Sequence, residues 1–413
     1  MLPVPFSMTE SSSSPSLDSS FFALGDPTEQ QVIYGPGSSV KVGECAKQLG
    51  SRALVVTDLG VSSAGHPHKV MKSLESAGIR TFLFEESMEN PTDSSVQECA
   101  RKAGILEIDL IIGVGGGSSL DTAKGANFIL TNGGSMKDYW GVSKATKPLL
   151  PMIAIPTTAG TGSECQSYAL ISDDQTHRKM ACGDPSALPK FTLLDPELTL
   201  SQPFSVCTAT GMDALAHALE SAVCSRRNDL SGRHARQAFV HLIKNLETVW
   251  KDPQDLLARG HVLLGAAHAG AAIERSMLGA AHALANPLTA QKGVIHGQAV
   301  GLCLPAVMAY NTEDLNSAKI YADLARIAGL ADSSTSDQQA NGLLLEKVIR
   351  LREFAGLPKS LEDVDCVASE LPKLSQDAAD QWTGTFNPRP IKESDWIKLY
   401  QSIDAHGDNR NEG

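Results

Sequence analysis

Four side chains that are able to bind a metal ion lie in the second half of the 413-residue chain. Asp213 and His217 are four residues apart in GMDALAHALE, and on a helix this spacing places both on one face. His282 follows in HALANP and His296 in VIHGQAV. One carboxylate and three imidazoles suit a divalent transition metal such as Fe²⁺ or Zn²⁺. Either pair alone is more often structural, but the four residues together predict a metal centre.

A glycine-rich turn, IIGVGGGSSLDTAK at residues 111–124, lies between an apolar strand and a helix. Glycines let the backbone approach a phosphate closely, and the N-terminus of a helix offers free N–H groups and the positive end of its dipole. An ordinary tight turn does not need three consecutive glycines. The pattern GxGGGSS differs from the usual GxGxxG fingerprint of dinucleotide sites. The residues predicted to wrap a pyrophosphate are Gly115, Gly116, Gly117 and Ser118.

Two further segments could complete a dinucleotide site. Asp58 ends the apolar segment ALVVTD, where an acid binds the ribose hydroxyls and repels a 2′-phosphate, so that NAD is favoured over NADP. The alternative for Asp58 is an N-cap at the start of a helix. The polar turn PTTAGTGSE (residues 156–164) follows a strand and is, by itself, a weak signal of a cofactor loop.

The hydrophobic pattern indicates two kinds of domain. From about residue 30 to 200, short apolar runs alternate with helix-like segments, which predicts a Rossmann-like α/β domain with a mostly parallel sheet. The predicted strands are 53–57, 81–84, 110–113, 152–156 and 192–194. Helical spacing dominates after Pro203 and predicts an all-α domain. The residues expected to separate its helices include Pro253, Pro287, Pro305 and Gly329.

These patterns set the expected domain boundaries. Residues 10–20 read ESSSSPSLDSS, a polar segment of low complexity, and a disordered tail is predicted for residues 1–26. The α/β domain is expected over residues 27–202 and the helical domain over residues 203–413.

Composition narrows the possible functions and the location. The net charge of −12 argues against broad binding to nucleic acid or to an anionic membrane. The apolar runs are too short to span a bilayer, and the first 26 residues lack the pattern of a secretory signal. None of the 8 cysteines forms a CxxC pair, which indicates reduced thiols and a cytoplasmic location.

The motifs taken together resemble the iron-containing (group III) alcohol dehydrogenases. The resemblance rests on GGGSSLDTAK, PTTAGTGSE, LDPELTL, ATGMDALAHALE, HALANPL and HGQAVGL, in the order of the family and over roughly residues 30–400. It implies a dinucleotide-binding α/β domain, a metal-binding helical domain and an active site in the cleft between them. It also implies a homodimer or a larger homo-oligomer.

The resemblance further implies roles for individual residues. The implied metal ligands are Asp213, His217, His282 and His296. The implied NAD contacts are Asp58, Asn90, Gly116, Gly117, Ser118, Thr157, Thr158, Lys179 and Leu198. For Lys179, a solvated surface lysine is the alternative. The implied reaction is hydride transfer between the nicotinamide and a small alcohol or aldehyde, with the metal as a Lewis acid on the substrate oxygen.

The chain departs from the family pattern at two places. Asn286 stands where the motif HxxxHP has a second histidine, and an amide does not titrate near neutral pH. We therefore expect proton release through the cofactor ribose and water. Glu274 and Arg275 replace small residues, and they predict either a surface ion pair or an arginine that binds an anionic group of the substrate. His261 and His268 receive no role.

Two other functions compete with an alcohol dehydrogenase or aldehyde reductase. A glycerol dehydrogenase or a dehydroquinate synthase-like enzyme would use the same fold. The DALAH motif and the spacing of fourteen residues between His282 and His296 argue against it, and so does the lack of a basic cluster for a phosphate-bearing sugar acid. A catalytically weak sensor that binds nucleotide and metal is an alternative of another class, favoured only by Asn286.

Overall fold

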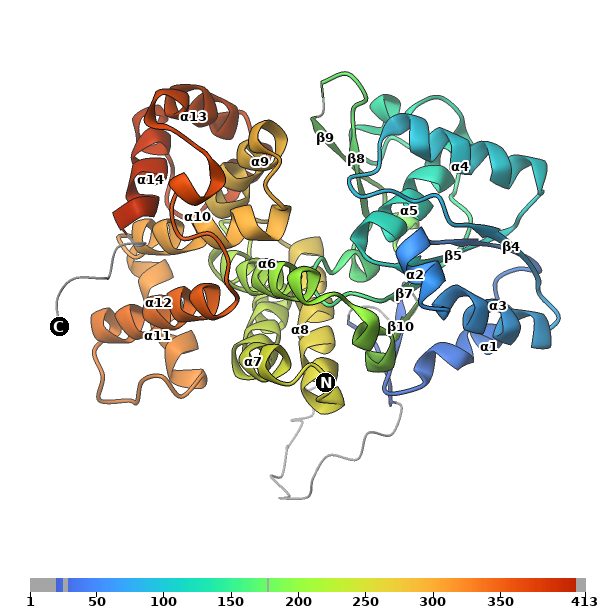
Figure 1. Ribbon diagram of the computed structural model, residues 1–413, viewed down its shortest axis with the longest axis horizontal. Helices are drawn as coiled ribbons and strands as arrows, with labels where there is room; N and C mark the ends of the chain where they lie inside the picture. The colour runs from blue at the N-terminus through green and yellow to red at the C-terminus, as the bar shows by residue number, and fades with distance from the viewer. Residues whose placement is uncertain (1–19, 25–28, 177, 406–413) are drawn as a thin grey trace, which may run out of the picture.

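The apolar run LIIGVG forms the strand β5 (Leu110–Gly115), which is buried along its whole length. The computed structural model describes residues 20–24, 29–176 and 178–405. β5 belongs to a seven-stranded sheet with the order β1-β2-β10-β7-β5-β3-β4 (Figure 1). The other strands of this sheet are β1 (Ser20–Phe22), β2 (Gln31–Tyr34), β3 (Arg52–Val56), β4 (Arg80–Phe84), β7 (Met152–Pro156) and β10 (Phe191–Leu194).

The sheet is parallel from β2 to β4, and only β1 runs antiparallel to its neighbour. In the register of the inner strands, Val55 lies opposite Ile112, and Ile112 lies opposite Ile153. Parallel strands end at the same edge, so the turns that follow β3, β5 and β7 meet there. This arrangement confirms the predicted α/β fold and places the glycine-rich turn beside the segment that contains Asp58.

Helices bury both faces of the sheet, as a parallel sheet requires. Leu54 and Val56 of β3 pack into the core on the side of α4 and α5, whereas Ala53 and Val55 pack with α1 and α3 on the other side. These helices are α1 (Val42–Ala46), α2 (Leu59–Ser63), α3 (His66–Ser76), α4 (Asp93–Ile105) and α5 (Gly117–Asn132).

A second, small sheet projects from this domain toward α9 (Figure 1). It contains β6 (Gly141–Val142), β8 (Tyr168–Ser172) and β9 (Lys179–Gly183) in the order β6-β9-β8. β8 and β9 form an antiparallel pair. Sequence reasoning predicted no strand in this segment.

From Phe204 to Ala405 the regular structure is helical, as predicted. The helices are α6 (Phe204–Val223), α7 (Asp229–Lys251), α8 (Leu256–Glu274), α9 (Ala280–Lys292), α10 (His296–Asn311), α11 (Leu315–Ile327), α12 (Asp337–Phe354), α13 (Leu371–Ala379) and α14 (Glu393–Ala405). They share one large apolar core. The helix α6 carries the first two predicted metal ligands through the middle of this core, where most of its residues are buried.

One of these helices, α8, is long and apolar enough to cross a membrane by length and composition. Its apolar window is 72% buried within the protein, against α6 and α7 among other elements. A buried core helix satisfies the same criterion, so α8 is read as part of the core.

Two prolines lie inside helices that they were expected to end. Pro287 lies within α9 and Pro305 within α10, and both are buried. A proline inside a helix removes one hydrogen bond and costs roughly 3 kcal/mol. The neighbouring apolar residues of both helices are buried in the shared core, and this packing offsets the local cost.

The tail prediction for residues 1–26 is wrong at its end. Ser20–Phe22 forms β1, in which Phe21 lies opposite Ile33 of β2. Leu24 is buried in the core of the helical domain. The composition of residues 10–20 is polar and predicts no strand at their end. The strand β1 nevertheless forms there, because it pairs with β2 at the edge of the sheet. Residues 1–19 lie outside the described residues.

The two domains meet at a close backbone contact between glycines. A Cβ atom at Gly270 of α8 would lie 2.3 Å from the carbonyl oxygen of Gly162, in the PTTAGTGSE turn. At Gly162 itself, a Cβ would lie 2.6 Å from the Cα of Gly270, and the φ angle of +65° also favours glycine. The absence of both side chains lets this turn rest directly on α8.

We expect Gly270→Ala to destabilise the fold by about 1–3 kcal/mol, because the added methyl group meets a backbone atom that side-chain rotation cannot move. The measurement is the unfolding midpoint in denaturant. Gly342→Ala is the matched control, since Gly342 is helical, exposed and has no atom within 4 Å of an added Cβ. The control should gain up to about 1 kcal/mol from helix propensity. Equal midpoints for the two variants would contradict the role of the contact.

Candidate metal and dinucleotide sites

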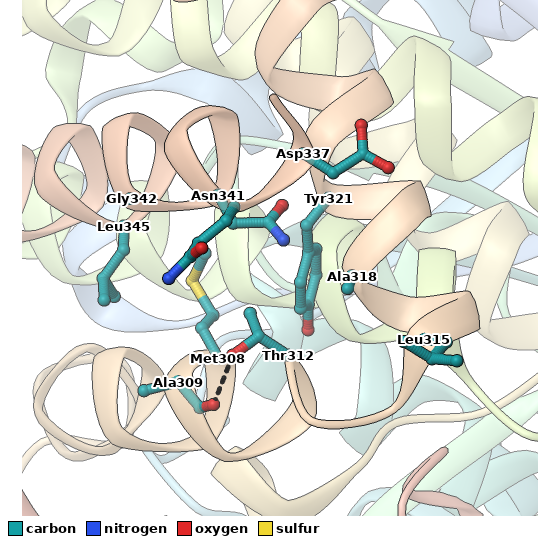
Figure 2. A pocket seen from close by; sticks show the side chains of 11 residues that line it. Met308, Ala309, Thr312, Leu315, Ala318, Tyr321, Asp337, Asn341, Gly342 and Leu345 are labelled. Carbon is teal, nitrogen blue, oxygen red and sulfur yellow. Dashed lines mark hydrogen bonds between the residues drawn. The ribbon is translucent and has the colours of Figure 1, made fainter. Parts of the chain in front are cut away.

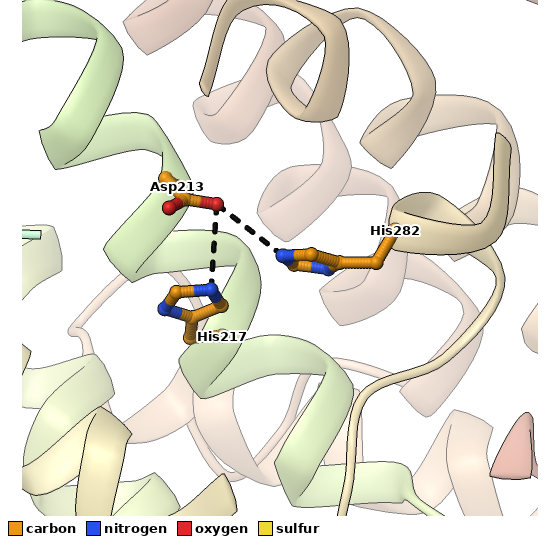
Figure 3. Close-up of side chains that lie close together, drawn as sticks. All are labelled: Asp213, His217 and His282. Carbon is orange, nitrogen blue, oxygen red and sulfur yellow. Dashed lines mark ion pairs between the residues drawn. The ribbon is translucent and has the colours of Figure 1, made fainter. Parts of the chain in front are cut away.

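The four predicted metal ligands come together at one carboxylate oxygen. The Nε2 atoms of His217, His282 and His296 lie 3.4, 3.3 and 3.9 Å from Oδ1 of Asp213. Figure 3 shows His217 and His282 turned toward Asp213 from two different helices. One ligand atom from each of Asp213, His217 and His282 lies within 4.8 Å of the other two.

The donor atoms at this point fit a metal ion. Oδ1 of Asp213 and Nε2 of His282 are buried and have no hydrogen-bond partner among the described residues. Buried polar atoms without partners are rare and costly. A divalent ion between them would satisfy both, and carboxylate and imidazole are ordinary ligands for Fe²⁺ or Zn²⁺. Burial would raise the pKa of Asp213, but the imidazoles of His217, His282 and His296 hold it well below its usual range.

Sequence reasoning missed Glu220, which lies behind His282. Its Oε2 is 2.5 Å from Nδ1 of His282, and its Oε1 accepts a hydrogen bond from the backbone N–H of Ala281 at 2.7 Å. A carboxylate that accepts a proton from Nδ1 leaves the lone pair of Nε2 to face a metal. Burial alone would lower the pKa of His282, but Glu220 and Asp213 raise it to about 9. The sequence spacing could have indicated this contact, because Glu220 is seven residues after Asp213 and therefore lies on the same face of the helix, two turns away.

A close helix contact positions His296. His296 is the first residue of α10, and a Cβ atom at the next residue, Gly297, would lie 2.1 Å from the backbone oxygen of Ala209 in α6. α10 therefore approaches α6 just before Asp213. Burial, followed by the charge of Lys179, lowers the pKa of His296 to about 3, so this imidazole is neutral and able to bind a metal.

Lys179 is the first residue of β9 and is half-buried. Burial lowers its pKa, and the charges of Asp121, Asp213 and Glu89 oppose that shift. Its influence on His296 also places it near the cluster.

The glycine-rich turn opens α5 at the edge where β3, β5 and β7 end (Figure 1). Gly116 is the N-cap of α5, and a Cβ there would lie 3.2 Å from Oγ1 of Thr158. A Cβ at Gly117 would lie 2.8 Å from the Thr161 side chain. The backbone N–H of Thr157 donates to Gly115 at 3.0 Å, which joins the two predicted cofactor loops.

Asp58 is the predicted N-cap, and its side chain also contacts the first turn of α5. Its Oδ1 caps α2 by accepting from Val61 N–H at 3.0 Å, and its Oδ2 accepts from the Ser119 hydroxyl at 3.0 Å. The same Oδ2 lies 3.4 Å from a Cβ position at Gly115. The carboxylate is therefore an N-cap and also lies directly beside the glycine-rich turn.

Two other predicted cofactor contacts lie in different surroundings. Asn90 is exposed in the loop after β4 and has a φ angle of +51°. The side chain of Leu198 is buried in the apolar core of the α/β domain. Leu198 could therefore touch a ligand only through its backbone.

The two departures from the family motif also have defined surroundings. The Asn286 amide donates to Oε1 of Gln381 at 3.0 Å.

Glu274 accepts from the backbone N–H of Ser167 at 2.9 Å and from its hydroxyl at 2.7 Å. It therefore joins α8 to the residue just before β8 and does not pair with Arg275. Arg275 donates to the carbonyl of Ala271 at 3.3 Å.

A separate cavity of about 540 Å³ lies among α10, α11 and α12 (Figure 2). Its lining includes Met308, Leu315, Tyr321 and Asn341. No residue predicted to bind metal or NAD lines it, so this cavity is separate from the candidate site.

Comparisons with known proteins place the chain in a family. The family model "Iron-containing alcohol dehydrogenase" matches residues 29–196, and "Fe-containing alcohol dehydrogenase family, C-terminal" matches residues 207–403. The NAD-dependent methanol dehydrogenase of Bacillus methanolicus is 31% identical over 371 residues, which cover 90% of this chain and 97% of that protein. The lactaldehyde reductase of Escherichia coli (strain K12) is 32% identical over 377 residues, 89% of this chain and 96% of that one. The crystal structure of a 1,3-propanediol oxidoreductase has a TM-score of 0.87 at 30% identity and covers 90% of this chain and 97% of its own.

The fold and the cluster define a two-domain oxidoreductase that acts on CH–OH groups. The chain belongs to the iron-containing alcohol dehydrogenase family, as its motifs predicted.

Proposed function

We propose that the protein is a metal-dependent, NAD(H)-linked alcohol dehydrogenase or aldehyde reductase that transfers hydride between the nicotinamide and a small alcohol or aldehyde. The observation that carries this proposal is the convergence of three imidazole nitrogens on Oδ1 of Asp213. This set accepts either Fe²⁺ or Zn²⁺. An ion bound there supplies a Lewis acid for the substrate oxygen.

The residues of the chain hold the reactants in place. The proposed metal ligands are Asp213, His217, His282 and His296. In the proposed cofactor site, the N–H groups of Gly116, Gly117 and Ser118 bind the pyrophosphate, and Asp58 binds the adenosine ribose. Thr157, Thr158, Lys179, Asn90 and the backbone of Leu198 complete this proposed set. Asn286 donates to Gln381 and does not titrate, so proton release through the cofactor ribose and water stays a prediction.

The direct test is NADH oxidation by the anaerobically Fe²⁺-loaded protein against short aldehydes, half of them neutral and half anionic. Turnover that requires both the metal and NADH supports the proposal. Stoichiometric binding of metal and NADH without turnover of any aldehyde or alcohol would favour the sensor alternative.

The preference for NAD is proposed to come from Asp58. We expect Asp58→Ser to raise kcat/KM with NADPH relative to NADH by at least about tenfold, because the repulsion of the 2′-phosphate is removed. Serine retains an N-cap oxygen for α2 and loses only the bond from the Ser119 hydroxyl, so the fold should be kept. The measurement is the ratio of kcat/KM for the two cofactors. An unchanged ratio would contradict the cofactor role and leave Asp58 as an N-cap alone.

The finer proposal is that the substrate carries an anionic group and that Arg275 binds this group. In the structure, this arginine donates to Ala271, and its backbone carbonyl accepts from Asn228 at 2.7 Å. The KM values of Arg275→Ala for matched neutral and anionic aldehydes decide the question. A rise of at least about tenfold confined to anionic aldehydes supports anion binding. Equal KM values for variant and wild type contradict it.

We also propose a cytoplasmic homodimer or larger homo-oligomer. All eight cysteines are buried free thiols, which agrees with a reducing compartment. The assembly follows from the family resemblance alone, and light scattering of the purified protein tests it.

A further inference from the structure

A row of histidines lies outside the proposed active site, along the contact between α7 and α8. Its members are His234 and His241 on α7 and His261 and His268 on α8. Each helix contributes two histidines seven residues apart, which places them on one face two turns from each other. The two helices pack against each other, and His234 meets His268 while His241 meets His261.

The imidazoles of this histidine row face each other through the same nitrogen in both pairs. Nδ1 of His234 lies 3.0 Å from Nδ1 of His268, and Nδ1 of His241 lies 3.2 Å from Nδ1 of His261. The rings of His241 and His268 stack with their centroids 6.1 Å apart, so the two pairs form one continuous row.

These distances suit chelation of an ion by each pair. Two nitrogens bound at about 2.0–2.1 Å to one ion lie about 2.9 Å apart at a right-angled bite and about 3.4 Å apart at a tetrahedral one. Both observed distances fall between these limits. In the structure each pair is joined by a direct N–H···N hydrogen bond. An ion bound by a pair would replace this bond, with the shared proton moved to the outer Nε2 of one ring, and an experiment must separate the two states.

The histidines of the row are in the protonation state that a metal requires. Burial is the first cause that lowers the pKa of each, to about 4 for His234 and His241 and to about 3 for His268. Burial also lowers the pKa of His261. Neutral imidazoles at pH 7 bind a metal without displacing a proton. His241, His261 and His268 are partly exposed, so an ion could reach them from solvent.

The surrounding charges moderate this affinity. Arg275 and Arg233 act on His234, and Lys244 acts on His241, whereas Asp255 acts on His261. The basic neighbours oppose a cation, so the site is expected to be weaker than one that includes a carboxylate. Two imidazoles without a carboxylate favour Zn²⁺, Cu²⁺ or Ni²⁺ over Mg²⁺ or Ca²⁺.

We propose that the histidine row binds divalent transition metal ions of the Zn²⁺ class, one at each Nδ1 pair, and thereby links α7 to α8. The row lies on other helices than Asp213 and its three histidines, so this site is independent of the proposed catalytic metal. Bound ions would hold the two helices together and leave the chemistry at Asp213 unchanged.

The test is equilibrium dialysis of the full chain against Zn²⁺, with bound metal measured by mass spectrometry. The wild type should bind two ions beyond the catalytic one. His268→Gln should weaken Zn²⁺ binding at one pair by at least about tenfold, so that one ion is lost. The double variant His261→Gln/His268→Gln should weaken binding at both pairs, so that both ions are lost. His68→Gln is the matched control, because His68 is an exposed histidine of α3 outside both sites. Asp213→Ala should retain the ions of the row, which separates this proposal from that of the catalytic site.

A second measurement needs no variant and therefore does not depend on variant folding. Zn²⁺ should slow amide hydrogen exchange of the wild type in peptides from α7 and α8. Equal Zn²⁺ binding by the double variant and the wild type would overturn the proposal. Slowing confined to α6, α9 and α10 would overturn it as well, because Zn²⁺ would then act only at the cluster around Asp213.

Discussion

Asp213→Ala is expected to abolish binding of the catalytic metal and to lower kcat/KM by about a thousand-fold or more. Oδ1 of Asp213 is the atom on which the three histidine nitrogens converge, and Asp213 supplies the one negative charge among the four ligands. A metal that polarises the substrate oxygen contributes several kcal/mol to the transition state, and each 1.36 kcal/mol is a factor of about ten in rate. Bound metal and NADH oxidation are measured on the same preparation.

Two comparisons make the Asp213 result specific. NADH should bind to Asp213→Ala as it does to the wild type, because the proposed dinucleotide site belongs to the other domain. Asp337→Ala removes an aspartate of α12 that pairs with Arg326 at 2.6 Å, and it should retain metal and activity. Full metal content and wild-type kcat/KM in Asp213→Ala would show that the cluster is not the catalytic metal centre.

The grouping of the proposed metal ligands could be predicted in part, because local geometry is encoded in sequence spacing. Asp213 and His217 lie one turn apart on any helix that contains both, so their proximity needed no knowledge of the fold. His282 and His296 are different, since three separate helices bring them to Asp213. Their residue types suggested that they join the first pair, and the family resemblance implied the same four ligands, but no spacing in the sequence fixed the contact. Glu220 was overlooked because a glutamate on a helix is usually solvated, and its contact with His282 depends on how α9 packs against α6.

The difference between local patterns and contacts made by packing also explains which parts of the fold were predicted wrongly. Strands β3, β5 and β7 were predicted because a parallel strand buried on both faces is a continuous apolar run. β1 lies at the end of a serine-rich segment, and its order depends on pairing with β2. Pro287 and Pro305 end a helix by local rules, but the packing of α9 and α10 overrides these rules. The histidine row likewise becomes visible only when α7 and α8 are placed side by side.

At pH 9, Glu220→Gln is expected to weaken metal binding by about 10- to 100-fold while leaving kcat largely recoverable at saturating metal. Loss of an outer carboxylate that orients a ligating histidine has this typical effect. Glutamine keeps the volume of the side chain and an oxygen for the Ala281 N–H, so the variant tests the charge facing His282. Titration with buffered Zn²⁺, followed by activity at each metal concentration, separates affinity from turnover.

The pH dependence distinguishes this role of Glu220 from a purely structural one. In the wild type, Glu220 and Asp213 raise the pKa of His282 to about 9 against the effect of burial, so a proton competes with the metal at every pH below that value. Removing the charge of Glu220 lowers this pKa and weakens the competition. The affinity of the variant should therefore depend less on pH than that of the wild type, and the difference between them should shrink as the pH falls from 9 to 7. Glu346→Gln, at an exposed glutamate of α12 that pairs with Arg350, should behave as the wild type. If the two pH profiles of Glu220→Gln and the wild type are parallel, Glu220 does not act through the protonation of His282.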